Sequence, residues 1–265
     1  MNMYLFELKS MRKSTIIWTC ALITLALFYI SIYPSVAKDA DDFKKLLSGY
    51  PASVRAMLGI NLDYITSFLG FYAMIFSFVT LFGAIQAMNL GVSILSKETR
   101  ERTADFLLVK PVSRLAIITA KLMAAFTMIL ATNIFFYAGS SILANTTQTA
   151  DFDQKLFFMI NLTLLFIQLI FLCFGMFVSL FFKRLKSILP ISLGVVFGLY
   201  LVGALIVTGK NDDVLRFISP FKYFDITYII KNASYEAPYL IAGAVIIVVA
   251  AVASYMIYVK KDIHV

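Results

Sequence analysis

The stretch LFFMINLTLLFIQLIFLCFGMFVSLFF, residues 156–182, contains no charged side chain. An α-helix rises about 1.5 Å per residue and the hydrocarbon core of a bilayer is about 30 Å thick, so about 20 apolar residues can cross it. The stretch is too long for a buried helix of a soluble protein, and it lacks the alternation of apolar and polar residues that marks barrel strands. It therefore predicts a transmembrane helix.

Five further stretches of the chain have the same apolar character. We expect transmembrane helices at residues 15–36, 64–94, 115–144, 156–182, 188–208 and 239–259. The composition agrees, because 61% of the 265 residues are hydrophobic and 14% are charged, whereas soluble domains have about 45–50% and about 25%. We expect an all-α integral membrane protein in which residues 1–265 form one transmembrane domain of six helices.

The charged residues divide unequally between the two sides of these expected helices. If the termini, the loop 95–114 with Lys121, and the loop 183–187 share one side, that side carries 14 basic and five acidic residues. Its net charge is +9, and the other side has a net charge of −1. Cytoplasmic loops of membrane proteins are enriched in Lys and Arg. We therefore expect both termini in the cytoplasm, and the overall charge of +8 needs no nucleic-acid partner.

Three segments outside the expected spans have helical patterns of their own. Residues 1–14 place apolar side chains mostly on one face and basic ones largely opposite, which predicts an N-terminal interfacial amphipathic helix. Residues 37–63 predict one or two short helices on the outer surface. The segment 209–238 is too interrupted to span and too apolar to lie free in water, so we expect short external helices, partly inserted and covered by protein, before the last span.

Residue types that usually build a catalytic or metal centre are scarce. Cys20 and Cys173 lie inside apolar stretches, and the single histidine, His264, has no acidic or cysteine cluster nearby. We therefore expect no metal centre and no acid–base centre. A membrane-bound lipid-modifying enzyme would need clustered Asp, Glu or His, and a secondary transporter usually needs ionisable groups near the bilayer midplane. Neither pattern is visible, and these two functions stay as the alternatives.

Neutral polar residues within the expected spans are candidates for a substrate path, because polar groups are costly in lipid and usually face protein or water. They are Gln86, Asn89, Asn133, Asn161 and Gln168. The alternative for each is a hydrogen bond to a neighbouring helix. Gly194 and Gly198, four residues apart, would let another helix approach closely and predict a seam between two subunits, although this spacing is frequent in membrane helices.

The cytoplasmic stretch SKETRERTADFLLVKPVSRLAIITAKLMAA, residues 96–125, is the most distinctive part of the sequence. Residues 97–105 are densely charged, and the next four are apolar. Pro111 disfavours helix at the residue before it, so a short helix in this stretch should end there. Ser113 is then placed to cap the following span, with Arg114 at the membrane boundary. Apolar residues ringed by charges favour a docking surface over a fully solvated loop.

This stretch resembles the signature loop of the membrane subunits of type-two ATP-binding-cassette exporters. In that family the connection between the second and third spans contains a glutamate, a Gly-Thr pair, a Leu-rich turn, Pro-x-Ser-Arg and a Gly-Lys pair. The matching residues here are Glu98 or Glu101, Thr103, Phe106, Leu107, Leu108, Pro111, Ser113, Arg114, Lys121 and Ala124. The six-span layout, the N-terminal interfacial helix and the segment Ser219-Pro220-Phe221 extend the resemblance over nearly the full chain.

The resemblance implies a non-catalytic permease subunit that pairs with a separate ATPase and with a second permease, either a copy of itself or a sister chain. Residues 96–110 would form a coupling helix in a groove of the ATPase. The residues expected to take part in this coupling are Glu98, Glu101, Arg102, Thr103, Phe106, Leu107, Leu108, Pro111, Ser113 and Arg114. ATP and magnesium are expected in the ATPase, and no cofactor is expected in this chain.

The implied function is export of an amphipathic substrate, such as a peptide, drug or lipid, across the plasma membrane of a bacterium. The chain has no phosphate-binding loop of its own: the nearest string, Gly203 to Lys210, has five residues between its glycines instead of four and lacks the Ser or Thr that should follow the lysine. ATP hydrolysis would therefore take place in the partner chain.

Overall fold

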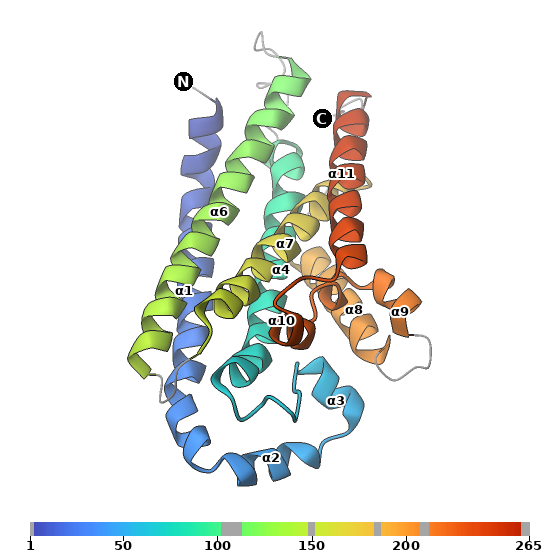
Figure 1. Cartoon of the computed structure of the whole chain (residues 1–265). Coiled ribbons are helices and arrows are strands. Elements are labelled where there is room, and N and C mark those ends of the chain that lie inside the picture. The colour runs from blue at the N-terminus through green and yellow to red at the C-terminus, as the bar shows by residue number, and fades with distance from the viewer. Residues whose placement is uncertain (1–2, 102–112, 148–151, 183–186, 207–211, 261–265) are drawn as a thin grey trace.

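A computed structural model of the chain describes residues 3–101, 113–147, 152–182, 187–206 and 212–260, and these residues form helices joined by turns, and no strands (Figure 1). The long helices are α1 (Met3–Lys38), α4 (Phe68–Glu101), α6 (Arg114–Thr147), α7 (Gln154–Ser179) and α11 (Ala237–Lys260). All five are long and apolar enough to cross a membrane, and α8 (Leu189–Ile206) is a shorter apolar helix. The predicted all-α class is confirmed.

The helix bounds follow local signals in the sequence. The side chain of Asp153 accepts hydrogen bonds from the backbone N–H groups of Lys155 and Leu156 and so caps the start of α7. The spans expected at 115–144, 156–182 and 239–259 correspond to α6, α7 and α11 with ends shifted by a few residues. The span expected at 188–208 corresponds to α8, whose 18 residues extend about 27 Å.

The N-terminal region differs from the expectation. Residues 1–14 were expected to form a separate interfacial helix, but α1 is one helix of 36 residues that extends about 54 Å. Between Met3 and Tyr33 the sequence contains neither glycine nor proline, so nothing in the backbone interrupts the helix. The expectation of a separate helix is therefore wrong, and the N-terminal residues continue the axis of α1 (Figure 1).

Short helices are present in both segments in which the sequence predicted them. The segment after α1 forms α2 (Ala40–Ser48) and α3 (Ala52–Met57). The segment before α11 forms α9 (Asp212–Leu215), η1 (Arg216–Ile218), η2 (Pro220–Lys222) and α10 (Ile226–Asn232). In the latter segment Ser219, Pro220, Tyr223 and Phe224 are buried, so protein covers the broken backbone as expected. All of these short helices lie in the half of the molecule away from both termini (Figure 1).

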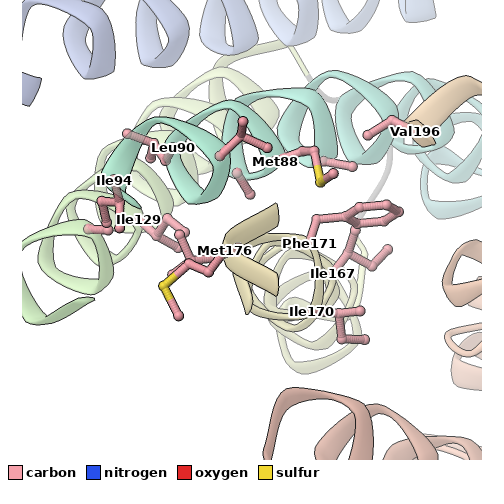
Figure 2. Packing of buried hydrophobic residues seen from close by; sticks show 14 of the residues in the cluster. Met88, Leu90, Ile94, Ile129, Ile167, Ile170, Phe171, Met176 and Val196 are labelled. Atoms are coloured by element: carbon pink, nitrogen blue, oxygen red, sulfur yellow. The ribbon is translucent and has the colours of Figure 1, made fainter. Parts of the chain in front are cut away.

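The centre of the bundle is the contact between α4 and α7. A Cβ atom built on Gly91 would collide with the carbonyl oxygen of Leu172, and one built on Gly175 would lie 2.7 Å from the carbonyl oxygen of Met88. The two backbones therefore touch at this crossing, which only glycine permits. Figure 2 shows the apolar side chains around it, among them Met88, Phe171 and Met176, which are fully or almost fully buried.

Candidate functional site

The expected coupling segment, residues 96–110, connects α4 to α6 at the end of the molecule that carries both termini (Figure 1). The helix α4 continues through the first part of this segment without a break, so Glu98 and Glu101 lie in its last turn. The remaining expected coupling residues before the next helix lie outside the described residues, namely Arg102, Thr103, Phe106, Leu107, Leu108 and Pro111.

The second flank of this segment is fixed to the rest of the bundle. The hydroxyl oxygen of Ser113 accepts a hydrogen bond from the backbone N–H of Ala116 at 3.2 Å, which is the cap that the sequence predicted for α6. The guanidinium of Arg114 donates to the carbonyl oxygen of Val259 at 3.1 Å. A basic side chain at a helix C-terminus satisfies a carbonyl that has no partner within the helix. Arg114 thus joins the start of α6 to the end of α11.

Three helices meet at a buried cluster of charges close to this end. The Lys121 ammonium of α6 donates to the Glu7 carboxylate of α1 at 3.0 Å, and their side chains are 0% and 4% exposed. The Lys97 ammonium of α4 lies 3.9 Å from the other carboxylate oxygen of Glu7 and donates to the Ser10 hydroxyl at 2.7 Å. Removing one partner of a buried ion pair commonly costs about 3–5 kcal/mol of folding free energy, because the other charge stays buried.

In the sequence, Glu7 counts only as one of the five acidic residues expected on the cytoplasmic side. A signal was present, however, because Glu7 lies three residues after Tyr4 and four before Met11 and so falls on the apolar face of the helix. An acidic residue on an apolar face needs a buried partner. The sequence alone did not show that Lys121 and Lys97, more than 80 residues away, would supply it.

The polar residues within the spans form a network that joins four helices. The side-chain amide of Gln168 (α7) donates to the amide oxygen of Gln86 (α4) at 3.1 Å, and Gln86 donates to the hydroxyl of Thr132 (α6) at 3.0 Å. Asn133 (α6) donates to the amide oxygen of Gln168 at 2.6 Å. Thr132 also shares a hydrogen bond with Thr19 of α1 at 3.0 Å. Three of the five residues expected on a substrate path are therefore brought together here.

The other two candidates for a substrate path lie apart from this network. Asn161 accepts a hydrogen bond from the hydroxyl of Tyr72 at 2.9 Å and donates to the carbonyl oxygen of Phe157 at 2.8 Å. Asn89 is half-buried. The side chains of Gln86, Asn161 and Gln168 are buried and hydrogen-bonded within the chain, which favours the alternative in which they link neighbouring helices.

A cavity of about 510 Å³ lies between α4, α7, α8 and residues 216–230. Its size is within the range of small-molecule sites. Its lining includes the hydroxyl residues Ser77, Thr80, Thr163 and Tyr200 and the charged residues Arg216, Lys222 and Asp225. The five candidates for a substrate path, all within the described part of the chain, do not line it.

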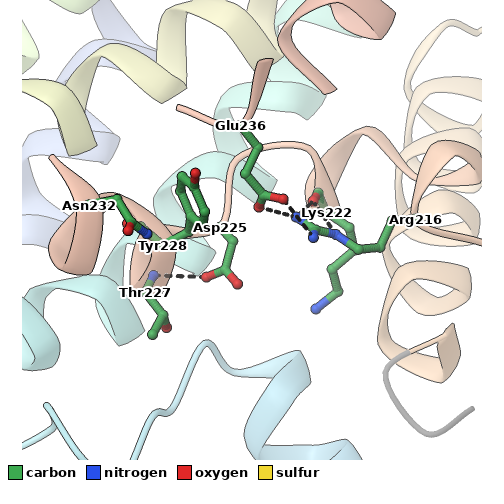
Figure 3. Close-up of polar contacts among 7 residues, drawn as sticks. All are labelled: Arg216, Lys222, Asp225, Thr227, Tyr228, Asn232 and Glu236. Carbon is green, nitrogen blue, oxygen red and sulfur yellow. Dashed lines mark hydrogen bonds and ion pairs between the residues drawn. The ribbon is translucent and has the colours of Figure 1, made fainter. Parts of the chain in front are cut away.

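Charged residues of the segment before α11 are held by close polar contacts (Figure 3). The Arg216 guanidinium donates to both carboxylate oxygens of Glu236, at 2.6 and 3.1 Å, and to the carbonyl oxygen of Lys222 at 3.0 Å. It also lies 4.1 Å from the centre of the Tyr239 ring. Burial lowers the pKa of Lys222 below its usual value, and the nearby Asp225 carboxylate opposes this effect. These contacts attach the segment to the start of α11.

Gly194 and Gly198 lie on the exposed face of α8. A Cβ atom built on either glycine would meet nothing within 4 Å among the described residues. The described part of the chain therefore does not make the close helix approach that the sequence predicted for this pair.

Comparison with known proteins identifies the family. A family model described as ABC-2 family transporter protein matches residues 1–263, nearly the full chain. A search of curated proteins gives no match. Membrane subunits of this family are generally non-catalytic, and the family implies both a membrane and an ATP-binding partner. The matched region includes every described helix, from α1 to α11. The chain therefore belongs to the ABC-2 transporter family and is a multi-pass membrane subunit of an ATP-binding-cassette transporter.

Proposed function

We propose that the chain is the permease of an exporter that moves an amphipathic peptide, drug or lipid across the plasma membrane of a bacterium. The observation that carries this proposal is the family match over residues 1–263. Family membership also favours a permease over a secondary transporter or a lipid-modifying enzyme. The energy comes from ATP hydrolysis in a separate ATPase subunit, where ATP and magnesium bind.

The 96–110 segment is the part of the chain that docks on the ATPase in this proposal. Two features of its flanks support this. The helix α4 continues to Glu101, and Ser113 caps the start of α6. Arg114, the first residue of α6, is hydrogen-bonded to the carbonyl oxygen of Val259 in α11. A displacement of the segment therefore reaches the membrane helices through rigid elements. Phe106 and Leu107 supply the apolar anchors, and Glu98, Glu101 and Arg102 form the polar rim.

Replacing both Phe106 and Leu107 by alanine should release the ATPase or uncouple its ATP hydrolysis from transport. A central apolar anchor commonly contributes about 2 kcal/mol or more to an interface, whereas rim charges contribute little. Membrane insertion should be unchanged, because neither residue lies in a described span. The measurement is co-purification of the ATPase with each variant, together with ATP hydrolysis by the complex.

Glu101→Ala is the matched control for this experiment, because it changes a rim residue of the same segment. We expect it to retain the ATPase. Full ATPase binding and coupled transport by the Phe106→Ala, Leu107→Ala double variant would contradict the docking assignment.

A second permease subunit completes the path, either another copy of this chain or a sister chain. We propose that contacts between the two subunits involve α1 and α8, with Gly194 and Gly198 at or near the seam. Support comes from the exposure of both glycines on α8. Of the polar candidates for the substrate path, Asn89 and Asn133 are the two that are only half-buried within one chain. These two residues are therefore the ones best able to face a path between subunits.

Cysteine labelling tests the proposed orientation, in which both termini are cytoplasmic. In a variant with Cys20 and Cys173 replaced by serine, Met3→Cys and Asp262→Cys should resist an impermeant thiol reagent applied to intact cells. Asp212→Cys should react, because it belongs to the segment expected outside. Permeabilised cells provide the control, since all three sites should react there. Labelling of either terminal cysteine in intact cells would reverse the orientation.

A further inference from the structure

One carboxylate contacts both flanks of the 96–110 segment. Lys97 lies at its start and Lys121 lies beyond its end, in the second turn of α6. Both lysines pair with Glu7, at 3.9 Å and 3.0 Å. Glu7 therefore joins α1 to the two helices that enter and leave this segment.

The Glu7 ion pairs matter because a displacement of the 96–110 segment reaches α1 by a different route from the one by which it reaches α4 and α6. Both α4 and α6 are joined to the segment through the backbone, so a displacement of the segment pulls on them directly. The helix α1 has no backbone link to it at this end, and it depends on side-chain contacts. Among the described residues near the N-terminus, these include the Glu7 pairs, the hydrogen bond from Lys97 to Ser10, the Lys97 ammonium over the Phe6 ring, and a hydrogen bond between the hydroxyls of Tyr4 and Thr127 at 2.9 Å.

A buried ion pair is a poor way to gain stability alone, since an apolar replacement of similar volume is often neutral or stabilising. It is a good way to hold two elements in one relative position, because the charge-assisted hydrogen bond between an ammonium and a carboxylate is strong only at a short donor–acceptor distance. Lys121 is 0% exposed and Glu7 is 4% exposed, so water cannot take the place of either partner without a rearrangement of the helices.

We propose that Glu7 is a positioning residue that passes the ATP-driven displacement of the 96–110 segment to α1. The inference rests on the proposed function, since it needs a docked ATPase. In this arrangement α1 moves together with α4 and α6 as one body at the cytoplasmic end. Without the carboxylate the segment still moves α4 and α6, and α1 stays behind.

Distance measurements between spin labels test this directly. Labels are attached at cysteines replacing Ile17 (α1), Ile134 (α6) and Val245 (α11), which are 69%, 65% and 53% exposed. The permease–ATPase complex, in lipid nanodiscs and with both native cysteines replaced by serine, is measured without nucleotide and after trapping with magnesium, ATP and vanadate. We expect the α1–α11 and α6–α11 distances both to shift in the otherwise unaltered protein. In Glu7→Gln only the α6–α11 shift should remain.

Two variants separate transmission from a simple loss of folding. Glu236→Gln breaks the ion pair with Arg216 at the start of α11, away from the 96–110 segment, and should keep both shifts. The double variant Glu7→Gln, Lys121→Met removes both buried charges and so restores stability, yet it should still lack the α1–α11 shift. Persistence of that shift in Glu7→Gln, or its return in the double variant, overturns the inference alone. If the unaltered permease retains no ATPase or shows neither shift, the proposed function fails as well.

Discussion

Replacing Gly91 by leucine should strongly destabilise the folded bundle, and replacing Gly175 by leucine should do the same. A Cβ on Gly91 would collide with the backbone of α7 at Leu172, and one on Gly175 would lie 2.7 Å from the Met88 carbonyl oxygen and 3.2 Å from the Val92 backbone nitrogen. Backbone atoms of a helix cannot rotate away as a side chain can. The two helices would have to separate along their whole contact.

The expected size of this effect follows from known costs of overpacking. Extra methylenes in a packed interior usually cost about 1–3 kcal/mol and occasionally more. The Gly91 site should be at or above the upper end, since the obstacle is backbone. A cost of about 3 kcal/mol corresponds to a fall in melting temperature of roughly 6–12 °C for a chain of this size. Thermal unfolding in detergent, followed by size-exclusion chromatography, measures it.

Val248→Leu, at a position of α11 that is 60% exposed, is the control for Gly91→Leu. We expect the control to melt as the unaltered protein does. Equal melting temperatures for Gly91→Leu and Val248→Leu would show that the α4–α7 contact does not depend on the glycines.

The spacing of small residues predicts a close helix contact but not the helix that makes it. Gly83, Ala87 and Gly91 repeat at a spacing of four on α4, which is the pattern of a close helix contact, and all three are buried. Gly194 and Gly198 of α8 have the same spacing, but both are exposed. Spacing shows that a face is narrow, but it does not show which partner covers that face, because that depends on residues far away in the chain.

Helix ends were predictable where the signal is local. The cap at Ser113 and the start of α6 at Arg114 follow from one proline and one serine, since capping involves residues only three apart. The sequence does not predict the continuous α1, because the charges of residues 1–14 are typical of a membrane surface, whereas Glu7 is buried and Met3 and Met11 pack against the core. The polar network could not be predicted from the sequence for a similar reason. The sequence shows that Gln86 and Gln168 would be costly in lipid, but it does not show that their side chains contact each other.

Substitutions on the face of α8 that carries Gly194 and Gly198 should weaken the contact between the two permease subunits more than substitutions elsewhere in the chain. Phe197 and Leu201 extend this face, at 41% and 51% exposure, while Val196 on the other face of α8 is fully buried. A narrow apolar face on one helix, open at two glycines, fits the close approach of a second helix.

Replacing Gly194 and Gly198 together by leucine should therefore separate the two permease subunits and leave each chain folded. Each leucine holds the facing helix away by the width of a side chain, at a cost of about 1–3 kcal/mol. Since 1.4 kcal/mol is a factor of ten in affinity, the dimer should weaken at least about tenfold. Light scattering on the detergent-extracted protein measures the mass, and Val248→Leu, an exposed position on α11, is the control. An intact dimer with normal transport in the double variant would remove α8 from the seam, because a backbone-close contact cannot accommodate two leucines.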